Sequence, residues 1–261
     1  MEDRVLDCLK TIGLSQLNTY LFLKYRSKKE NGQLRIINDL EVDNLTFVEQ
    51  IDVNTLIMQD IYDATNQQLI DFNQAPSNIQ ILHINNCRLS NIQGVEYMML
   101  QQLDLSNNNI SDISALTTMF CVKSLNLARN QIFDLSALRQ LIYLNHLDLS
   151  CNKINDLTDI SKLNELISLL FVGNEVSDLS PLSNMSILTH LDASYNQIEN
   201  ISVLALLNNL QYVNLRSNYI TDAHLLNHLP LQTLIIDQQQ THIQQISCKC
   251  YENGSRAEEN L

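Results

Sequence analysis

The stretch LNHLDLSCNKINDLTDISKL, from Leu144 to Leu163, decides the fold, because it is one copy of a pattern that recurs every 22 residues. Counted from Leu144 as position 1, apolar residues occupy positions 1, 4, 6, 11, 14, 17 and 20, and asparagine occupies position 9. A regular period of this length predicts a repeat protein. Further units with the same pattern begin at Leu100, Val122, Leu166 and Leu188.

Within each unit, the spacing of the apolar residues predicts a short strand followed by a turn. Side chains at positions 4 and 6 point to one face of a strand, whereas those at positions 3, 5 and 7 point to the other. We therefore expect the leucines to form a shared core and the intervening residues to face outward. A single unit is too small to be stable alone, so the fold requires stacked units.

Two polar positions are expected to support the turns. The amide at position 9 can donate to and accept from turn backbone that would otherwise be buried unpaired, so stacked units should form an asparagine ladder. Its members are Asn108, Asn130, Asn152, Asn174, Asn196 and Asn218. At position 13 an aspartate such as Asp156 precedes Ser or Thr at position 15, which predicts a carboxylate that caps a short helical turn.

The pattern LxxLxLxxNxIxxLxxLxxL resembles the leucine-rich repeat family. The aspartate before position 14 is similar to the 22-residue class shared by phosphatase-1 regulatory subunits and bacterial internalins, and DLSPLSNM at 178–185 matches that class best. The resemblance implies an α/β fold, namely a right-handed leucine-rich repeat solenoid. It would have a parallel β-sheet on the concave face and short 3-10 or helical turns on the convex face.

The pattern weakens towards both ends of the chain. Residues 3–26 alternate at helical spacing, so we expect a helical N-terminal cap at 1–33, in which the basic run at 24–29 is a solvated helix end. Degenerate strand-forming repeats are expected at 34–78, beginning with the sets Ile37/Leu40/Val42 and Val53/Leu56/Met58. We expect the repeat solenoid at 79–247 and a polar C-terminal tail at 248–261.

Composition argues against several kinds of partner. The chain has 16 Lys+Arg against 29 Asp+Glu and a formal net charge of −13, which repels nucleic acid and acidic membrane surfaces. The first ten residues lack the pattern of a secretory signal, and no apolar run approaches the ~20 residues that span a bilayer. We therefore expect a cytoplasmic monomer with reduced thiols, in which Cys248 and Cys250 are ordinary tail residues.

Catalytic, metal and cofactor sites are not predicted. Only five glycines are present, and no phosphate-binding loop can be written from them. The segments His146–Ser150 and His190–Ser194 place His, Asp and Ser on the outward face of two strands. However, residues two apart on a strand are separated by about 6.6 Å, beyond hydrogen-bond contact, and the two segments lie too far apart to share a metal ion.

The outward positions 3, 5, 7 and 8 give the strongest functional signal. Most are small and polar, but Leu170 and Val172 place two aliphatic residues in neighbouring outward slots. Aromatic residues and arginine around an aliphatic patch are typical of a protein-binding hot spot. We predict a protein partner on the concave face, contacted by Leu170, Val172, Tyr195, Tyr212, His146, His190, Asp148, Asp192, Arg216 and Arg129.

The predicted function is therefore a non-enzymatic, protein-binding scaffold or adaptor. Asp104, Asp148 and Asp192 lie on alternate strands and favour a partner with basic groups. The resemblance implies two alternatives, a regulatory subunit of a type-1 serine/threonine phosphatase and a surface adhesin of the internalin type.

Overall fold

The computed structural model describes residues 28–30, 33–37, 55–59 and 79–236. Eleven strands form one sheet in sequence order, with β1 antiparallel to β2 and every later pair parallel. The strands are β1 (Lys28–Glu30), β2 (Gln33–Ile37), β3 (Thr55–Gln59), β4 (Ile81–Asn85), β5 (Gln102–Asp104), β6 (Ser124–Asn126), β7 (His146–Asp148), β8 (Ser168–Leu170), β9 (His190–Asp192), β10 (Tyr212–Asn214) and β11 (Thr233–Ile235).

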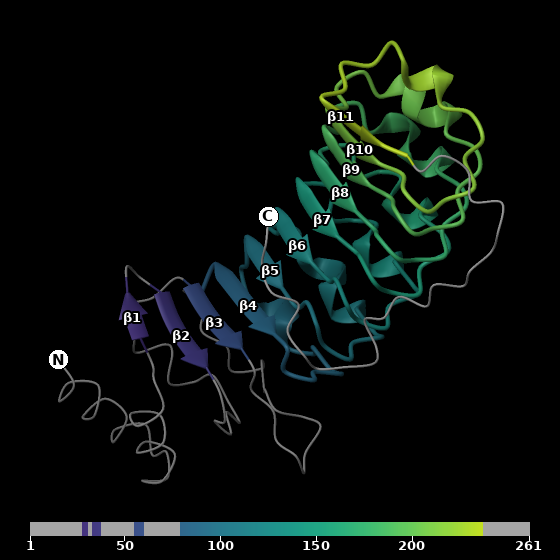
Figure 1. The fold of residues 1–261 in the computed structure, drawn as a ribbon. Helices are drawn as coiled ribbons and strands as arrows, with labels where there is room; N and C mark the ends of the chain where they lie inside the picture. Colours follow the sequence, from purple (N-terminus) through teal and green to yellow (C-terminus); the bar gives the residue numbers. More distant parts are fainter. Residues whose placement is uncertain (1–27, 31–32, 38–54, 60–78, 237–261) are drawn as a thin grey trace, which may run out of the picture.

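A 3-10 turn follows each strand from β4 to β10. These turns are η3 (Val95–Tyr97), η4 (Ser114–Thr118), η5 (Ser136–Leu138), η6 (Thr158–Ile160), η7 (Ser180–Asn184), η8 (Ser202–Leu206) and η9 (His224–Leu226). Figure 1 shows the strands on the inner side of a curved stack and the turns on its outer side. The predicted solenoid with a concave parallel sheet is confirmed.

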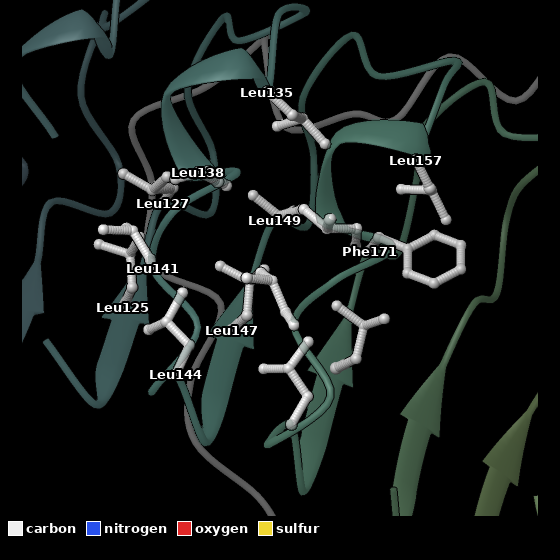
Figure 2. Close-up of a cluster of buried hydrophobic side chains, with 14 of the residues drawn as sticks. Leu125, Leu127, Leu135, Leu138, Leu141, Leu144, Leu147, Leu149, Leu157 and Phe171 are labelled. Atoms are coloured by element: carbon white, nitrogen blue, oxygen red, sulfur yellow. The ribbon is translucent and has the colours of Figure 1, made fainter. Parts of the chain in front are cut away.

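The core is a stack of leucine rows. Leu103 pairs in register with Leu125, which pairs with Leu147, and all three side chains are buried. Figure 2 shows Leu125 beside Leu147, with Leu127, Leu149 and Phe171 in a neighbouring row. The small Ala193 follows Phe171 at the same position one unit later, and both are fully buried. The large and the small side chain thus occupy successive places in the same buried row.

The position-9 asparagines form a continuous hydrogen-bonded ladder. In the unit of Leu144, Asn152 Oδ1 accepts from the Ile132 N–H at 2.9 Å, and its Nδ2 donates to the carbonyls of Leu127 and Leu149, each at 3.0 Å. The pattern repeats from Asn108 to Asn218. At the first full unit, Cys87 stands at position 9 and its N–H donates to Asn108 Oδ1.

The outer turns begin as the aspartate spacing predicts. Asp156 Oδ1 accepts from the N–H of Thr158, the first residue of η6, at 2.8 Å. Equivalent bonds reach Asp112, Asp134, Asp178 and Asp222, and Asn200 takes the same role before η8. These hydrogen bonds lower the pKa of Asp134, Asp156, Asp178 and Asp222.

The beginning of the sheet differs from the expectation. Lys28 and Lys29 lie in β1 and not at a helix end, because residues 28–30 pair with 33–35 in an antiparallel hairpin. The sequence signal for this hairpin is the Asn-Gly pair after Glu30, which favours tight turns. Strand β2 also begins earlier than expected, and β3 contains the predicted Leu56 and Met58. The rest of the cap (1–27), Leu40, Val42 and the tail (248–261) lie outside the described residues.

Candidate protein-binding surface

Most of the inner strands end at an aspartate or asparagine at position 5. Its side-chain oxygen accepts from the N–H two residues later, at 2.9 to 3.1 Å, and this bond turns the chain out of the sheet. The acceptors are Asp104, Asn126, Asp148, Asp192 and Asn214. These strands are three residues long, as are β8 and β11, which end at Leu170 and Ile235. Position 7 was expected on the outward strand face; it lies there in β4, which ends at Asn85, but from β5 to β10 it follows the strand on a turn.

Position 8 is left-handed in every unit from Asn86 to Ser217. The φ angles lie between 55° and 65°, at Asn86, Asn107, Arg129, Cys151, Gly173, Tyr195 and Ser217. Backbone bonds between coils hold this conformation; for example, the Tyr195 N–H donates to the Arg216 carbonyl at 2.8 Å. Glycine adopts this region without steric conflict, whereas a residue with a Cβ is disfavoured there by about 1–2 kcal/mol.

Leu170 is the exception among the strand ends from β5 to β10. Its side chain cannot accept a hydrogen bond, and the Val172 N–H donates instead to Ser150 Oγ of the preceding coil, at 3.2 Å. Leu170 pairs in register with Asp148 on one side and with Asp192 on the other. The side chains of Leu170 and Val172 are half-buried. An aliphatic residue thus replaces a structural acceptor between two carboxylates.

The electrostatics of the inner face centre on Asp148. Burial raises the pKa of this carboxyl, and the negative charges of Asp104 and Asp192 raise it further, while hydrogen bonds from Ser150 act in the opposite direction. Because the neighbouring charges that act on Asp148 are negative, the region around Leu170 favours a positive group.

The remaining predicted residues surround Leu170 on several coils. Tyr212 stacks on His190, with ring centroids 6.1 Å apart and planes 17° from parallel. The side chain of Tyr195 is 37% exposed. Both Arg216 and His146 are exposed, and His146 pairs in register with Ser168 of β8. Arg129 is exposed on the turn after β6, two coils before Leu170, and therefore lies towards the edge of the predicted set.

The His, Asp and Ser triplets make more contact than expected but do not form a triad. Ser194 Oγ donates to Asp192 Oδ1 at 2.6 Å, because the chain turns back after Asp192 instead of continuing as a strand. His190 Nδ1 contacts Thr189 Oγ1 at 2.8 Å and its ring stacks on Tyr212, so it does not join the pair. Within the described ranges, no group of three His, Cys, Asp or Glu side chains could hold a metal ion.

A second exposed surface was not predicted. It is a row of apolar side chains that precede the inner strands, namely Tyr97, Met99, Phe120, Ile142 and Tyr143, each at least 42% exposed. We call it the edge row. The later coils carry mostly polar residues at the same positions, such as Asn164 and Glu165. The signal in the sequence is an apolar residue at position 21 of the first three units, with Tyr143 at position 22; Tyr97 lies at position 19, and of the later coils the unit of Leu166 carries the exposed Ile187 at position 22.

Comparisons with known proteins agree with this architecture. A family model described as a leucine-rich repeat matches residues 98–116 and 140–157. Internalin C2 of Listeria monocytogenes is 27% identical, with a TM-score of 0.63 over 79% of this chain and 80% of that chain. The internalin inlF of the same organism is 23% identical, with a TM-score of 0.62 over 79% of this chain and 73% of that chain.

A leucine-rich-repeat protein of Leptospira interrogans is 18% identical, with a TM-score of 0.59 over 77% of this chain and 60% of that chain. These last two likenesses, below 25% identity, support the fold alone. The chain therefore has the leucine-rich-repeat fold that these proteins share. No curated protein matches the sequence.

In the part of the chain that the structure describes, no helix is long and apolar enough to span a membrane.

Proposed function

We propose that this protein is a non-enzymatic, cytoplasmic binding scaffold that holds a protein partner on its concave face, with Leu170, Val172, Tyr195 and Tyr212 as anchors. The observation that supports it most is Leu170, because the other strand ends from β5 to β10 use an acceptor at that position. Leu170 is only half-buried and lies at position 5, which is not one of the seven core positions of the repeat, so packing within the solenoid does not account for it.

Tyr195 supports the same surface. It occupies a left-handed position at which Gly173 shows that glycine is compatible with the coil. A residue with a Cβ is disfavoured there by about 1–2 kcal/mol relative to glycine, a cost that Arg129 and Cys151 share, so the support comes from the exposed ring and not from the backbone conformation. Tyrosine is also among the residues most enriched at binding hot spots.

The test is a double variant that restores the repeat pattern, Leu170→Asn with Tyr195→Gly. Both substitutions copy residues found at the same positions in other coils, Asn126 and Gly173, so the melting temperature should stay the same or rise. Affinity purification from the native cell should lose a partner that the wild-type protein retains. Retention of that partner by the double variant would reject the site.

The matched control is a double variant on other surfaces, Phe133→Ser with Tyr143→Asn, which also copies residues of other coils, Ser111 and Asn209. Both original side chains are more than half exposed. This control should keep the partner. A type-1 phosphatase among the retained proteins would identify the scaffold as a phosphatase regulatory subunit.

A second candidate function is a surface adhesin of the internalin type, which the 27% identity to internalin C2 favours. Protease treatment of intact cells distinguishes the two. A cytoplasmic scaffold stays protected until the cells are lysed, whereas an adhesin is degraded on the intact cell.

A further inference from the structure

The strand ends on the inner face alternate in charge. From β5 to β10, position 5 reads Asp104, Asn126, Asp148, Leu170, Asp192 and Asn214, and each residue pairs in register with the next. A carboxylate therefore never lies directly beside another carboxylate in this row. Leu170 occupies a slot that the alternation assigns to an amide.

The missing amide leaves the space between Asp148 and Asp192 without a donor from β8. At β10 the amide binds its neighbour in the row, since Asn214 Nδ2 donates to Asp192 Oδ2 at 3.0 Å, whereas the side chain of Asn126 accepts from the Ala128 N–H. At the other end of the row, Asn85 at position 7 of the preceding coil donates through Nδ2 to Asp104 Oδ2 at 2.6 Å. Leu170 offers an aliphatic surface in place of such a donor. The result is an apolar strip between two carboxylates.

We propose that Leu170, Asp148 and Asp192 together form a receptor for one cationic side chain of the partner, and that this side chain is an arginine. Its methylene stem would lie on Leu170 and Val172, and its guanidinium would lie between the two carboxylates. This inference rests on the proposed function, because the partner must occupy the same concave face.

Geometry favours arginine over lysine. Asp148 and Asp192 lie on strands two apart, so their backbones are separated by about 9.6 Å. A guanidinium carries five N–H donors directed to several sides of a plane, whereas an ammonium is a compact point charge. Arginine can therefore donate to both carboxylates at once while its stem covers Leu170. The guanidinium would also place a positive charge beside Asp148. Among the described residues, the charged groups that act on this carboxyl are the negative Asp104 and Asp192.

The experiment is an NMR titration of the full chain, labelled at leucine and valine methyl groups, with N-acetyl-arginine amide at constant ionic strength. The methyl signals of Leu170 and Val172 should shift on titration, and N-acetyl-lysine amide should require several-fold more ligand. N-acetyl-citrulline amide has the same shape without the charge and should produce no shift. Equal shifts with citrulline would overturn the proposal.

Two pairs of variants make the titration specific. Asp148→Asn with Asp192→Asn keeps both strand-end acceptors, as Asn126 does, and should abolish the arginine-induced shifts. Asp156→Asn with Asp178→Asn removes the same number of charges from the outer turns and should leave the shifts unchanged. Shifts that persist in the first pair, or that vanish equally in both, would contradict the receptor.

The same variants separate this inference from the proposed function. If the inner pair retains the partner fully while Leu170→Asn with Tyr195→Gly loses it, the scaffold stands and the arginine receptor fails. If every variant retains the partner, the proposed binding face fails as well. If both inner-face variants lose the partner and the outer pair retains it, the result supports the proposed binding face and the arginine receptor.

Discussion

The inner and outer edges of each coil use the same hydrogen bond with opposite electrostatic results. On the inner edge, Asp148 accepts from the Ser150 N–H at 2.9 Å; on the outer edge, Asp156 accepts from the Thr158 N–H at 2.8 Å. Both aspartates also receive a bond from the hydroxyl of that second residue. Yet the pKa of Asp148 is raised, mainly by burial, and the pKa of Asp156 is lowered by its hydrogen bonds.

The surroundings of the two carboxylates account for this difference. Asp156 is exposed, so its hydrogen bonds outweigh the small effect of desolvation, and the charged form stabilises the turn. Asp148 is partly buried in a row with Asp104 and Asp192, so the same hydrogen bonds do not compensate. The outer aspartates are therefore structural caps, whereas the inner row maintains a concentration of negative charge that suits a cationic partner.

The largest loss of stability is expected at Asn152, where a hydrogen-bonding side chain is buried in the core. In Asn152→Ala, the buried Ile132 N–H loses the acceptor that Asn152 Oδ1 provides, and two ladder carbonyls lose a donor. Because water cannot replace these bonds, we expect the free energy of unfolding to fall by about 3 kcal/mol. Denaturant unfolding of the full chain measures it.

The exposed Asn155, three residues further on, gives the matched control. Asn155→Ala should change the unfolding free energy by no more than about 0.5 kcal/mol. A loss in Asn152→Ala as small as in Asn155→Ala would show that the ladder contributes no more than a surface amide.

An intermediate effect is expected on the outer edge. Asp156→Ala removes the cap of η6 and should lower the unfolding free energy by about 0.5–1 kcal/mol at neutral pH. The folded pKa is depressed, so this contribution is present above the unfolded pKa and is lost as pH falls through the folded pKa. Thermal unfolding between pH 7 and acid conditions should show the difference between wild type and Asp156→Ala shrink on acidification, because protonation removes the charge-dependent part of the cap.

Asp156→Asn separates the cap from its charge. Asn200 already accepts from the Ser202 N–H at 2.9 Å, so an amide can fill this position. The Asn variant should keep most of the stability at neutral pH and lose most of its dependence on acid. If Asp156→Asn is as unstable as Asp156→Ala, the charge and not the hydrogen bond is the stabilising part.

The sequence was sufficient for the architecture because the repeat is redundant. A residue such as Leu125 is specified both by its own unit and by Leu103 and Leu147 in the neighbouring units, so the register could be predicted. The β1–β2 hairpin is the one antiparallel pair in the described part of the chain and lies outside the repeat, and the helical spacing of the preceding residues led to the prediction of a helix there. Redundancy, and not local propensity, made the prediction of the solenoid secure.

The site was only partly predictable. Leu170 could be recognised as an outlier in its column, but the role of position 5 as a strand-end acceptor depends on backbone geometry after the strand. The same geometry makes Ser194 touch Asp192, which an extended strand does not allow. The left-handed state of Tyr195 also has no signal in one unit, since Asn, Arg, Cys and Gly occupy the equivalent positions.

The smallest effect, and the one of opposite sign, is expected at Asp148. Asp148→Asn keeps the acceptor for the Ser150 N–H and removes a charge that burial and two like charges disfavour, so stability at neutral pH should rise, by about 0.5 kcal/mol or less. In the wild type, the pKa of Asp148 is higher in the folded than in the unfolded protein. The stabilising contribution of this carboxyl is therefore complete below the unfolded pKa, and it declines as pH rises through the folded pKa.

The stability advantage of Asp148→Asn over wild type should consequently grow as pH rises through the acid range. The advantage of wild type over Asp156→Asn should grow over the same range, because the sign of that pKa shift is reversed. Measuring unfolding free energies of the three proteins at matched pH values tests the comparison directly. Slopes of the same sign at both positions would mean that burial does not distinguish the two edges, and the inner row would then be one more set of caps.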